Sequence, residues 1–584
     1  MVREDSGQPR TARGAFVDRL VGWRHDRLAG VSTTGLVLAT LFYVGANTPS
    51  LLPRPWHLQG LISAICGTLG YAVGVTFAAI GGAFATWSGL TVTVKPSARR
   101  VMLTIAFSVV ALGILVFPLM SIRWQQFTST YVGFDPPGAA YVVESTLAAV
   151  AVFAVFVFGW RFVAGLVDLL TLRLGHRLLR ESLARAVASV VTVLLVGFAI
   201  DRVVLPGGIL LASRRADQIN ATHPEGYHAP TSATRSGGPG SLESWESLGQ
   251  DGAIFVADGP TSADIEAALG RAAKDPIRVF AGVAEGRTLP QIRDAVLAEM
   301  DRTGAFDRAA IYVVSSTSTG YVNEWSASAF EYLGAGDTAV VSMQYSTLPS
   351  ALALMSASDE PITASKLLWE GVLARVAARP PERRPKVYAG GESLGAYGGN
   401  DMFAWPEQML SQVAGAVWTG TPAFSRTRAS LTAERAIGST AVNPVISGGQ
   451  HFRFASNPSE LTGDQYGHAL GEWATPRVVY LQHESDPVAW WSTDLLFASP
   501  DWLRETRVGG PMSQMSWYPL VTFFQVSADM AMSNTVPGGY GHRYTQGDTV
   551  PAWAAVLGLD PRADYSPITS RIDLATRQGA AGNR

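Results

Sequence analysis

The chain of 584 residues carries a formal net charge of −2, and 16% of its residues are charged against 47% that are hydrophobic. The charge balance excludes the strongly basic surface with which proteins bind nucleic acid, and the length predicts two or more domains. Low charge with a mean hydropathy of +0.16 is typical of a chain that is part membrane and part globular. The single cysteine, Cys66, excludes intrachain disulfides and cysteine-based metal clusters.

Five apolar runs occupy the first 210 residues, after a basic leader over residues 1–29 that is expected to be cytoplasmic. A helix needs about 20 mostly apolar residues to cross a bilayer, and each run is close to that length or longer. We therefore predict an all-α transmembrane domain of about five helices over residues 30–210, kept as an anchor and not cleaved as a signal peptide. The predicted spans are Gly30–Ala46, Leu58–Thr86, Val101–Met120, Val142–Trp160 and Val187–Val204.

Lys and Arg residues alternate between rich and poor loops along this domain. Six arginines precede the first run, the second loop holds Lys95, Arg99 and Arg100, the fourth holds five arginines, and the first and third loops hold one each. Because cytoplasmic loops carry the excess of positive charge, we expect a multi-pass protein of the cytoplasmic membrane with its N-terminus inside and its C-terminal domain outside. Gly70 and Gly74 form a GxxxG pair, which predicts close helix packing within the domain or, alternatively, a homo-oligomer contact.

A second domain is expected after a linker. Over residues 211–243 Ser, Thr, Gly, Pro and His replace the apolar runs, and Arg235-Ser-Gly-Gly-Pro-Gly-Ser is typical of a flexible linker. Over residues 244–570 short β-branched runs alternate with helical stretches, which predicts a mostly parallel sheet with helices on both faces, followed by a tail over residues 571–584. The predicted strands are Arg278–Val283, Ala310–Ser315, Thr338–Tyr345, Lys386–Ala389, Gly415–Thr419 and Arg477–Leu481, and the predicted helices are Leu289–Met300, Glu324–Leu333, Thr363–Ala378 and a stretch after Ser393.

The segment Gly391-Glu-Ser-Leu-Gly395 matches the pattern G-x-S-x-G. It stands directly after a predicted strand and before a predicted helix, which is the setting that a nucleophile elbow requires. The pentapeptide alone is a weak signal because Gly and Ser are abundant in this chain. In its strand–turn–helix setting it predicts that Ser393 is the nucleophile of an α/β-hydrolase domain.

A serine hydroxyl needs a base to become a nucleophile, and in this fold the partners follow in the order Ser, Asp or Glu, His. Asp486 comes just after a predicted strand end, where the acid belongs, and Glu484 and Asp494 are its substitutes. Only His542 follows Asp486, in a Gly-rich loop, so the order selects it as the base. The alternatives are a turn cap for Asp486 and an ordinary loop histidine for His542.

Donors to the developing oxyanion are also required. The backbone N–H of Leu394 is the first expected donor, and Thr317, in the loop from Ser316 to Tyr321 after the strand Ala310–Ser315, is the second, with its hydroxyl as an additional donor. A helix-capping loop is the alternative for the second. Residues 422–475 form a long insertion between two strands and are expected to be a lid. The histidines lack paired spacing with carboxylates, so neither a metal nor another cofactor is expected.

Several segments resemble one known family. They are Trp245-Glu-Ser-Leu-Gly, Thr319-Gly-Tyr-Val, Gln344-Tyr-Ser-Thr-Leu-Pro, Gly391-Glu-Ser-Leu-Gly-Ala, Tyr480-Leu-Gln-His-Glu-Ser-Asp-Pro-Val and Gly541-His542. Together they resemble the bacterial membrane-bound α/β-hydrolase family with an N-terminal multi-span domain, and the likeness covers nearly the whole chain. The resemblance implies the fold, the topology and the triad positions but no substrate.

The sequence thus predicts a membrane-anchored serine hydrolase that cleaves carboxylic esters, esterase-like or lipase-like, through an acyl-enzyme. Its location suggests a lipid or acylated envelope substrate and contact with membrane lipids. An acyltransferase with the same triad and a non-catalytic membrane scaffold are the alternatives. A transporter is disfavoured because the apolar runs lack paired charges.

Overall fold

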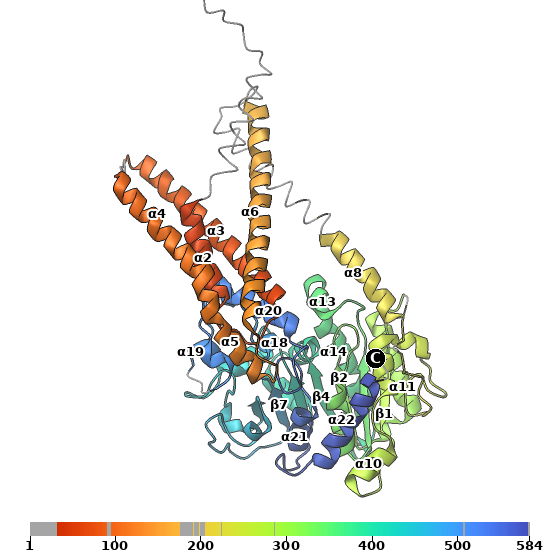
Figure 1. The fold of residues 1–584 in the computed structure, drawn as a ribbon. Helices are drawn as coiled ribbons and strands as arrows, with labels where there is room; N and C mark the ends of the chain where they lie inside the picture. The colour runs from red at the N-terminus through yellow and green to blue at the C-terminus, as the bar shows by residue number, and fades with distance from the viewer. Residues whose placement is uncertain are drawn as a thin grey trace, which may run out of the picture.

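The computed structural model describes residues 32–89, 95–175, 205–223, 225–284, 286–505 and 509–581, with three single positions between 191 and 202. Figure 1 shows two parts: long helices from the N-terminal region, and a domain built on a parallel sheet from which these helices rise. The N-terminal helices are α2 (Thr33–Ala46), α3 (Trp56–Trp87), α4 (Pro96–Ala111), the π-helical turn Leu112–Val116, α5 (Phe117–Tyr131), α6 (Ala139–Gly175) and α8 (Leu205–Asn220).

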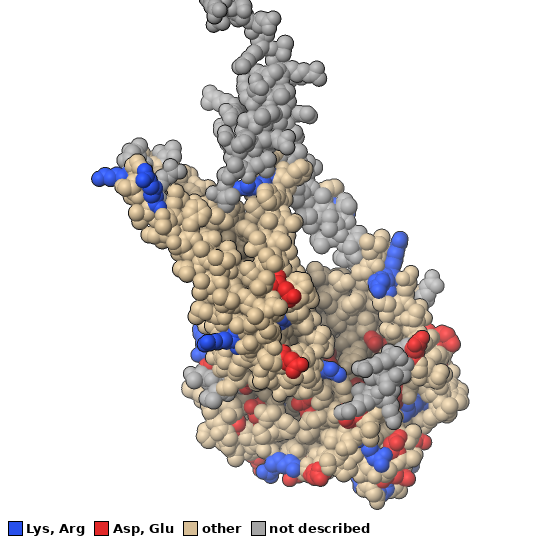
Figure 2. Space-filling model, viewed as in Figure 1, with Lys and Arg blue, Asp and Glu red and all other residues tan. Residues whose placement is uncertain are grey.

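Among the residues that the structure describes, three helical stretches are long and apolar enough to cross a membrane: Trp56–Ala85, Pro96–Tyr131 and Ala139–Gly165. They correspond to the second, third and fourth predicted spans. The first run forms α2, an apolar helix of 14 residues. The fifth, Val187–Val204, falls almost wholly outside the described residues. Figure 2 shows a nearly uncharged surface over these helices, with Lys and Arg side chains at the end farthest from the sheet domain.

The GxxxG pair lies where α3 packs on α2. A Cβ on Gly70 would lie 2.5 Å from the carbonyl oxygen of Leu38, and one on Gly74 would lie 2.7 Å from that of Thr34. Any side chain at either position would therefore push the two helices apart. Of the two interpretations of this pair, packing within the chain is the one that the structure realises.

The sheet domain contains seven parallel strands in the order β1-β3-β2-β4-β5-β7-β6. Six of them match the predicted strands. The seventh, β6, lies inside the segment 422–475 that we expected to be a lid, so part of this segment forms the edge of the sheet. The strands are β1 (Ile277–Ala281), β2 (Ala310–Ser315), β3 (Thr338–Met343), β4 (Lys386–Glu392), β5 (Gly415–Thr419), β6 (Phe452–Ala455) and β7 (Arg477–Leu481).

Helices cover both faces of the sheet, as predicted. Successive residues of a strand point to opposite faces, and in β1 Val279 joins one buried apolar cluster while Phe280 joins the other. The helices of this domain are α9 (Gly249–Ala257), α10 (Ser262–Leu269), α11 (Leu289–Thr303), α12 (Glu324–Leu333), α13 (Ser350–Ser356), α14 (Glu360–Ala377), α15 (Leu394–Asp401), α16 (Pro406–Gln412), α17 (Arg426–Ala433), α18 (Pro487–Trp490), α19 (Asp501–Arg504), α20 (Val521–Met532), α21 (Gln546–Val556) and α22 (Ser566–Ala581).

Residues 234–243, expected to be part of a flexible linker, instead pack against the sheet domain. Arg235 forms a parallel bridge with Arg278 of β1. The buried carboxylate of Glu299, on α11, accepts a hydrogen bond of 2.8 Å from the hydroxyl of Ser236. The small polar residues of this segment thus supply hydrogen-bonded turns and not freedom of movement.

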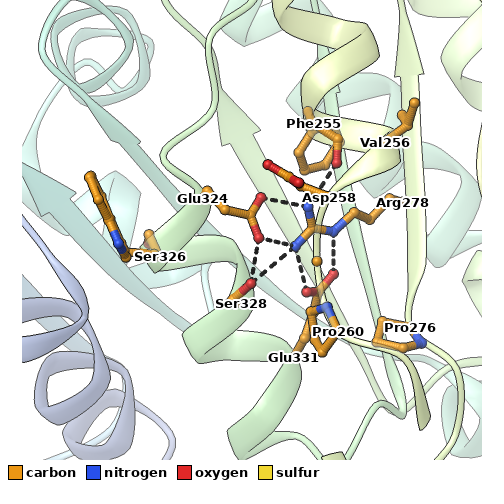
Figure 3. Close-up of polar contacts among 12 residues, drawn as sticks. Phe255, Val256, Asp258, Pro260, Pro276, Arg278, Glu324, Ser326, Ser328 and Glu331 are labelled. Atoms are coloured by element: carbon orange, nitrogen blue, oxygen red, sulfur yellow. Dashed lines mark hydrogen bonds and ion pairs between the residues drawn. The ribbon is translucent and has the colours of Figure 1, made fainter. Parts of the chain in front are cut away.

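Arg278 ties β1 to the helices that cover it. Its guanidinium is fully buried and lies 2.7 Å from Glu331 and 2.6 Å from Glu324, both on α12, and it donates to the carbonyl oxygen of Phe255 on α9 at 2.7 Å (Figure 3). A buried charge is tolerated only when it is paired and hydrogen-bonded. These contacts meet that condition and fix α12 and α9 against the edge of the sheet.

The N-terminal apolar helices and the sheet domain share a buried interface at α20. Arg54, in the loop between α2 and α3, lies 2.6 Å from Asp529 of α20, and both side chains are fully buried. The same carboxylate accepts a hydrogen bond of 3.0 Å from the N–H of Leu51. Beside this ion pair, an apolar cluster combines residues of α2 and α3 with residues of α20; its buried members are Ala46, Ile62, Cys66, Val521 and Ala528.

Candidate active site

Ser393 stands on a sharp turn between β4 and α15, with φ of +57° and ψ of −124°. This is a backbone conformation that a residue with a side chain seldom adopts. Neither Gly391 nor Gly395 has room for a Cβ, because the carbonyl oxygen of Ser315 at the end of β2 would collide with it. The turn therefore has the tight geometry expected of a nucleophile elbow.

Leu394 is the first residue of α15. The first N–H groups of an α-helix have no partner within the helix, and the helix dipole places partial positive charge there. The N–H of Leu394 is therefore suited to receive a developing negative charge beside Ser393.

The predicted base and acid lie together. Nδ1 of His542 is 2.8 Å from Oδ2 of the fully buried Asp486. This network assigns the proton to Nδ1, which leaves Nε2 as a proton acceptor. Nε2 is buried and has no hydrogen-bond partner among the described residues. The histidine bonds to Asp486 and not to Glu484 or Asp494, the two substitutes considered from the sequence.

Asp486 also serves as the N-cap of α18. Its Oδ1 accepts a hydrogen bond of 2.9 Å from the N–H of Val488. The turn-cap interpretation is therefore correct but does not compete with the catalytic one, because the two oxygens of the carboxylate have separate partners.

Tyr544 and His483 were not identified from the sequence. The Tyr544 hydroxyl donates to Oδ2 of Asp486 at 2.7 Å, and its ring stacks on His483 with the centroids 4.0 Å apart. Nδ1 of His483 lies 3.0 Å from the carbonyl oxygen of Gly541, next to the base. The only signals in the sequence were the proximity of Tyr544 to His542 and of His483 to Asp486.

Charge and burial act in opposite directions on the pKa of His542. Burial lowers it, but the negative charge and hydrogen bond of Asp486, together with the charge of Glu392, outweigh this and raise the pKa above 6.5. Glu392 precedes the nucleophile, and burial raises its pKa to about 7 against the opposing effects of His542 and of a hydrogen bond from Asn323.

Ser393, Leu394, Thr317 and His542 line one cavity of about 740 Å³. The backbone N–H of Thr317 donates to the carbonyl oxygen of Tyr321 at 3.1 Å, because this loop closes on itself. The backbone donor expected here is therefore occupied. The Thr317 hydroxyl, which lies 3.4 Å from the hydroxyl of Thr319, is the remaining candidate donor of this residue. Of the segment 422–475, only Pro422 and Phe424 line the cavity.

The described residues contain no group of three His, Cys, Asp or Glu placed to hold a metal ion. A hydroxyl on a strained turn, a histidine with a free Nε2 and a buried carboxylate behind it form the constellation used for nucleophilic acyl transfer.

Two family models match the chain, each over a different part of it. The model of the "Alpha/beta-hydrolase family" matches residues 277–567, and that of the "Alpha/beta-hydrolase family N-terminus" matches residues 48–260. No curated protein matches the chain. Among solved structures, Trichoderma reesei cutinase in complex with a C11Y4 phosphonate inhibitor shows 11% identity over 41% of this chain and 85% of the cutinase, with a TM-score of 0.19, which is too low to support any argument.

Proposed function

Because the chain belongs to the alpha/beta-hydrolase family, we propose that it is a membrane-anchored serine hydrolase that cleaves carboxylic esters with Ser393, His542 and Asp486. The observation that carries this proposal is the buried His542–Asp486 pair at 2.8 Å. Nε2 of this histidine has no hydrogen-bond partner among the described residues, and His542 lines the same cavity as Ser393.

The reaction proceeds through an acyl-enzyme. Nε2 of His542 takes the proton of the Ser393 hydroxyl as the oxygen attacks the ester carbonyl, and it then protonates the departing alcohol. Water attacks the acyl-enzyme by the same route, which releases the carboxylic acid and restores the serine. Asp486 holds the imidazole in the required tautomer and stabilises its charged form.

The developing oxyanion is stabilised by the N–H of Leu394 and the hydroxyl of Thr317. Both groups line the cavity beside Ser393. Donors fixed in place before the reaction are effective because they do not reorganise as the charge forms.

The hydrolase domain is proposed to lie outside the cytoplasmic membrane. Lys95 and Arg100 stand at the start of α4, at the end of the membrane helices that Figure 1 places farthest from the sheet domain. The positive-inside rule assigns that end to the cytoplasm. The opposite end, which contacts the hydrolase domain, then faces outward.

The test is labelling of the full chain in detergent with a fluorophosphonate probe, which reacts with activated serines. We expect labelling of the wild type, none of Ser393→Ala, and full labelling of Ser411→Ala, which changes an exposed serine on α16. Wild type that has not been treated with the probe should release free acid from a soluble ester such as p-nitrophenyl butyrate. Folded wild type that stays unlabelled, or label that persists in Ser393→Ala, would overturn the proposal.

A further inference from the structure

The cavity at Ser393 has a mostly apolar wall. Its size of about 740 Å³ is within the range of ligand sites, which span roughly 300–1,000 Å³. Apolar side chains from five separate segments of the hydrolase domain line it: Trp325, Leu354, Met355, Phe424, Trp491 and Met530. A wall of this kind favours a hydrocarbon chain over a sugar or a charged group.

One side of the cavity is attached to the membrane helices. Met530 belongs to α20, and the same helix buries Val521 and Ala528 in a cluster with Ala46 of α2 and Ile62 of α3. Helix α20 therefore lines the cavity on one side and packs against α2 and α3 on the other.

The other side is attached to α8, which follows the fifth apolar run. Asn220 of α8 accepts a hydrogen bond of 2.8 Å from Gln344, and Asp217 accepts one of 2.6 Å from Thr347. Near the middle of α8, which spans Leu205–Asn220, Leu211 keeps 68% of its surface exposed. A rise of 1.5 Å per residue puts Asn220 about 14 Å along the helix from Leu211.

Helix α13 lies between these two attachments. It begins at Ser350, three residues after Thr347, and contributes Leu354 and Met355 to the cavity wall. The side chain of Met355 is nevertheless 75% exposed. Figure 1 shows α13 on the face of the hydrolase domain from which α3, α6 and α8 rise. The exposed side of α13 at the cavity is thus on the same face of the hydrolase domain as the apolar helices.

We infer that α13 touches the bilayer surface and that the cavity takes the long acyl chain of an ester held in the adjacent leaflet. The ester moves from the leaflet past Met355, so that its carbonyl reaches Ser393 while the chain stays in apolar surroundings. This inference rests on the proposed function, since it names the substrate class of the same site. The observation that carries it is the position of α13 at the cavity. It lies between α20, which packs on α2 and α3, and α8, which follows the fifth apolar run.

The first test locates α13 in the full chain reconstituted in phosphatidylcholine vesicles. Cys66 is buried, so a cysteine introduced by Met355→Cys is the one that a thiol-reactive NBD dye reaches. Ala267→Cys, exposed on α10 at the far end of the domain (Figure 1), is the matched control. We expect doxyl-labelled lipid to quench the dye at position 355 but not at position 267. Equal quenching at both sites, or none at 355, would overturn the placement.

The second test compares two esters with one head group. Dioleoylglycerol held in the vesicles should be hydrolysed with a kcat/KM at least about tenfold above that of water-soluble dibutyrylglycerol, because the longer chain buries more apolar surface. Fluorophosphonate labelling in the same vesicles separates the two proposals. If a sample of the preparation takes up the label while an untreated sample cleaves dibutyrylglycerol as fast as dioleoylglycerol, the membrane-held substrate is contradicted but the serine hydrolase stands. Folded protein that does not react with the fluorophosphonate would contradict both proposals.

Discussion

Oδ2 of Asp486 accepts two hydrogen bonds, one from Nδ1 of His542 at 2.8 Å and one from the hydroxyl of Tyr544 at 2.7 Å. Its Oδ1 accepts a third from Val488. Hydrogen bonds to a carboxylate favour the charged form and fix its orientation. Because the carboxylate cannot rotate away, the imidazole is held in one plane, with Nε2 toward the cavity. Tyr544 is thus a positioning residue in the proposed mechanism.

The hydroxyl of Thr317 can be tested by a matched pair of substitutions. Thr317→Val keeps the shape of the side chain but removes the donor, and we expect kcat to fall by about 10²–10³, as for other oxyanion donors. Thr317→Ser keeps the hydroxyl and should stay within a few-fold of the wild type. Ester hydrolysis by the full chain measures both variants. If valine and serine gave equal rates, the second oxyanion donor would have to come from another group.

The carboxylate of Glu392 leads to a prediction about how kcat/KM depends on pH. His542 must be neutral to accept a proton, and its pKa is raised above 6.5, so kcat/KM should fall as the pH falls through that raised value. The charge of Glu392 contributes to the rise. Glu392→Gln keeps the size of the side chain and its hydrogen bond from Asn323, and it should move this acid limb to lower pH by about one unit or less. A limb that moved to higher pH would contradict the assignment.

The same substitution has an expected effect on stability. Burial raises the pKa of Glu392 from 4.5 to about 7, so the folded protein favours the protonated carboxyl. The resulting stabilisation is complete below pH 4.5 and is lost as the pH rises through 7. Glu392→Gln removes this dependence. Its thermal unfolding temperature, measured in detergent, should therefore exceed that of the wild type by more at pH 8 than at pH 5.

The proposed triad could be selected from the sequence because chain order constrains its members. G-x-S-x-G selects Ser393, and His542 is the only histidine after Asp486. Tyr544 and His483 follow no such rule, since their roles depend on a stacking contact between segments about 60 residues apart. The sequence placed Thr317 in a loop that lines the cavity. It could not show that the backbone N–H of Thr317 bonds to Tyr321, because this contact depends on how the loop closes.

At the scale of elements, the sequence predicted what periodicity and apolar content determine. The bounds of helix Glu324–Leu333 agree with the structure, and six strands were expected where they occur. Strand β6 was missed because its four residues, Phe-Arg-Phe-Ala, are too few to display a pattern, and the neighbouring β7 decides their pairing. The linker was misjudged because composition does not reveal a buried partner such as Glu299.

The loop between α2 and α3 is the element whose packing links the two domains. Arg54 and Asp529 form a fully buried ion pair 2.6 Å apart, and Met530, the residue after Asp529, lines the cavity. The N–H of His542 donates to the carbonyl oxygen of Ser533 at 2.9 Å, just beyond the end of α20. The ion pair therefore supports the segment that holds the proposed base.

We predict that Arg54→Met destabilises the full chain by about 3–5 kcal/mol, because it leaves Asp529 buried without its partner. The double variant Arg54→Met with Asp529→Leu should recover most of this loss, since no charge then remains buried. Thermal unfolding of the purified protein in detergent, followed by near-ultraviolet circular dichroism, measures both. If the double variant lost as much as the two single variants together, the two side chains would not be energetically coupled.

At the scale of the whole molecule, the N-terminal helices contact the hydrolase domain at two places, α2 and α3 at α20, and α8 at the segment after β3. The first buries an apolar cluster and an ion pair, whereas the second consists of hydrogen bonds that Asp217 and Asn220 accept from Thr347 and Gln344. Hydropathy alone predicted the membrane helices but not this contact, because an apolar helix looks the same in sequence whether it faces lipid or protein. Through this interface the N-terminal helices pack against α20, which lines the cavity of the candidate active site.

This interface predicts how the hydrolase domain behaves without its membrane helices. A chain of residues 211–584 would expose Val521 and Ala528 of α20 to water and would leave Asp529 without Arg54. Exposed apolar surface of this kind drives association, and Asp529 loses the contacts with Ser50, Leu51 and Arg54 that hold α20 in place beside the cavity. We expect this shortened chain to aggregate without detergent and to lose at least about tenfold in fluorophosphonate labelling rate, since each 1.4 kcal/mol of lost positioning costs a factor of ten. Size-exclusion chromatography and timed labelling beside the full chain measure both effects. A monomeric fragment that labels at the full rate would mean that the hydrolase domain holds its own active site and that the membrane helices serve only to place it at the bilayer.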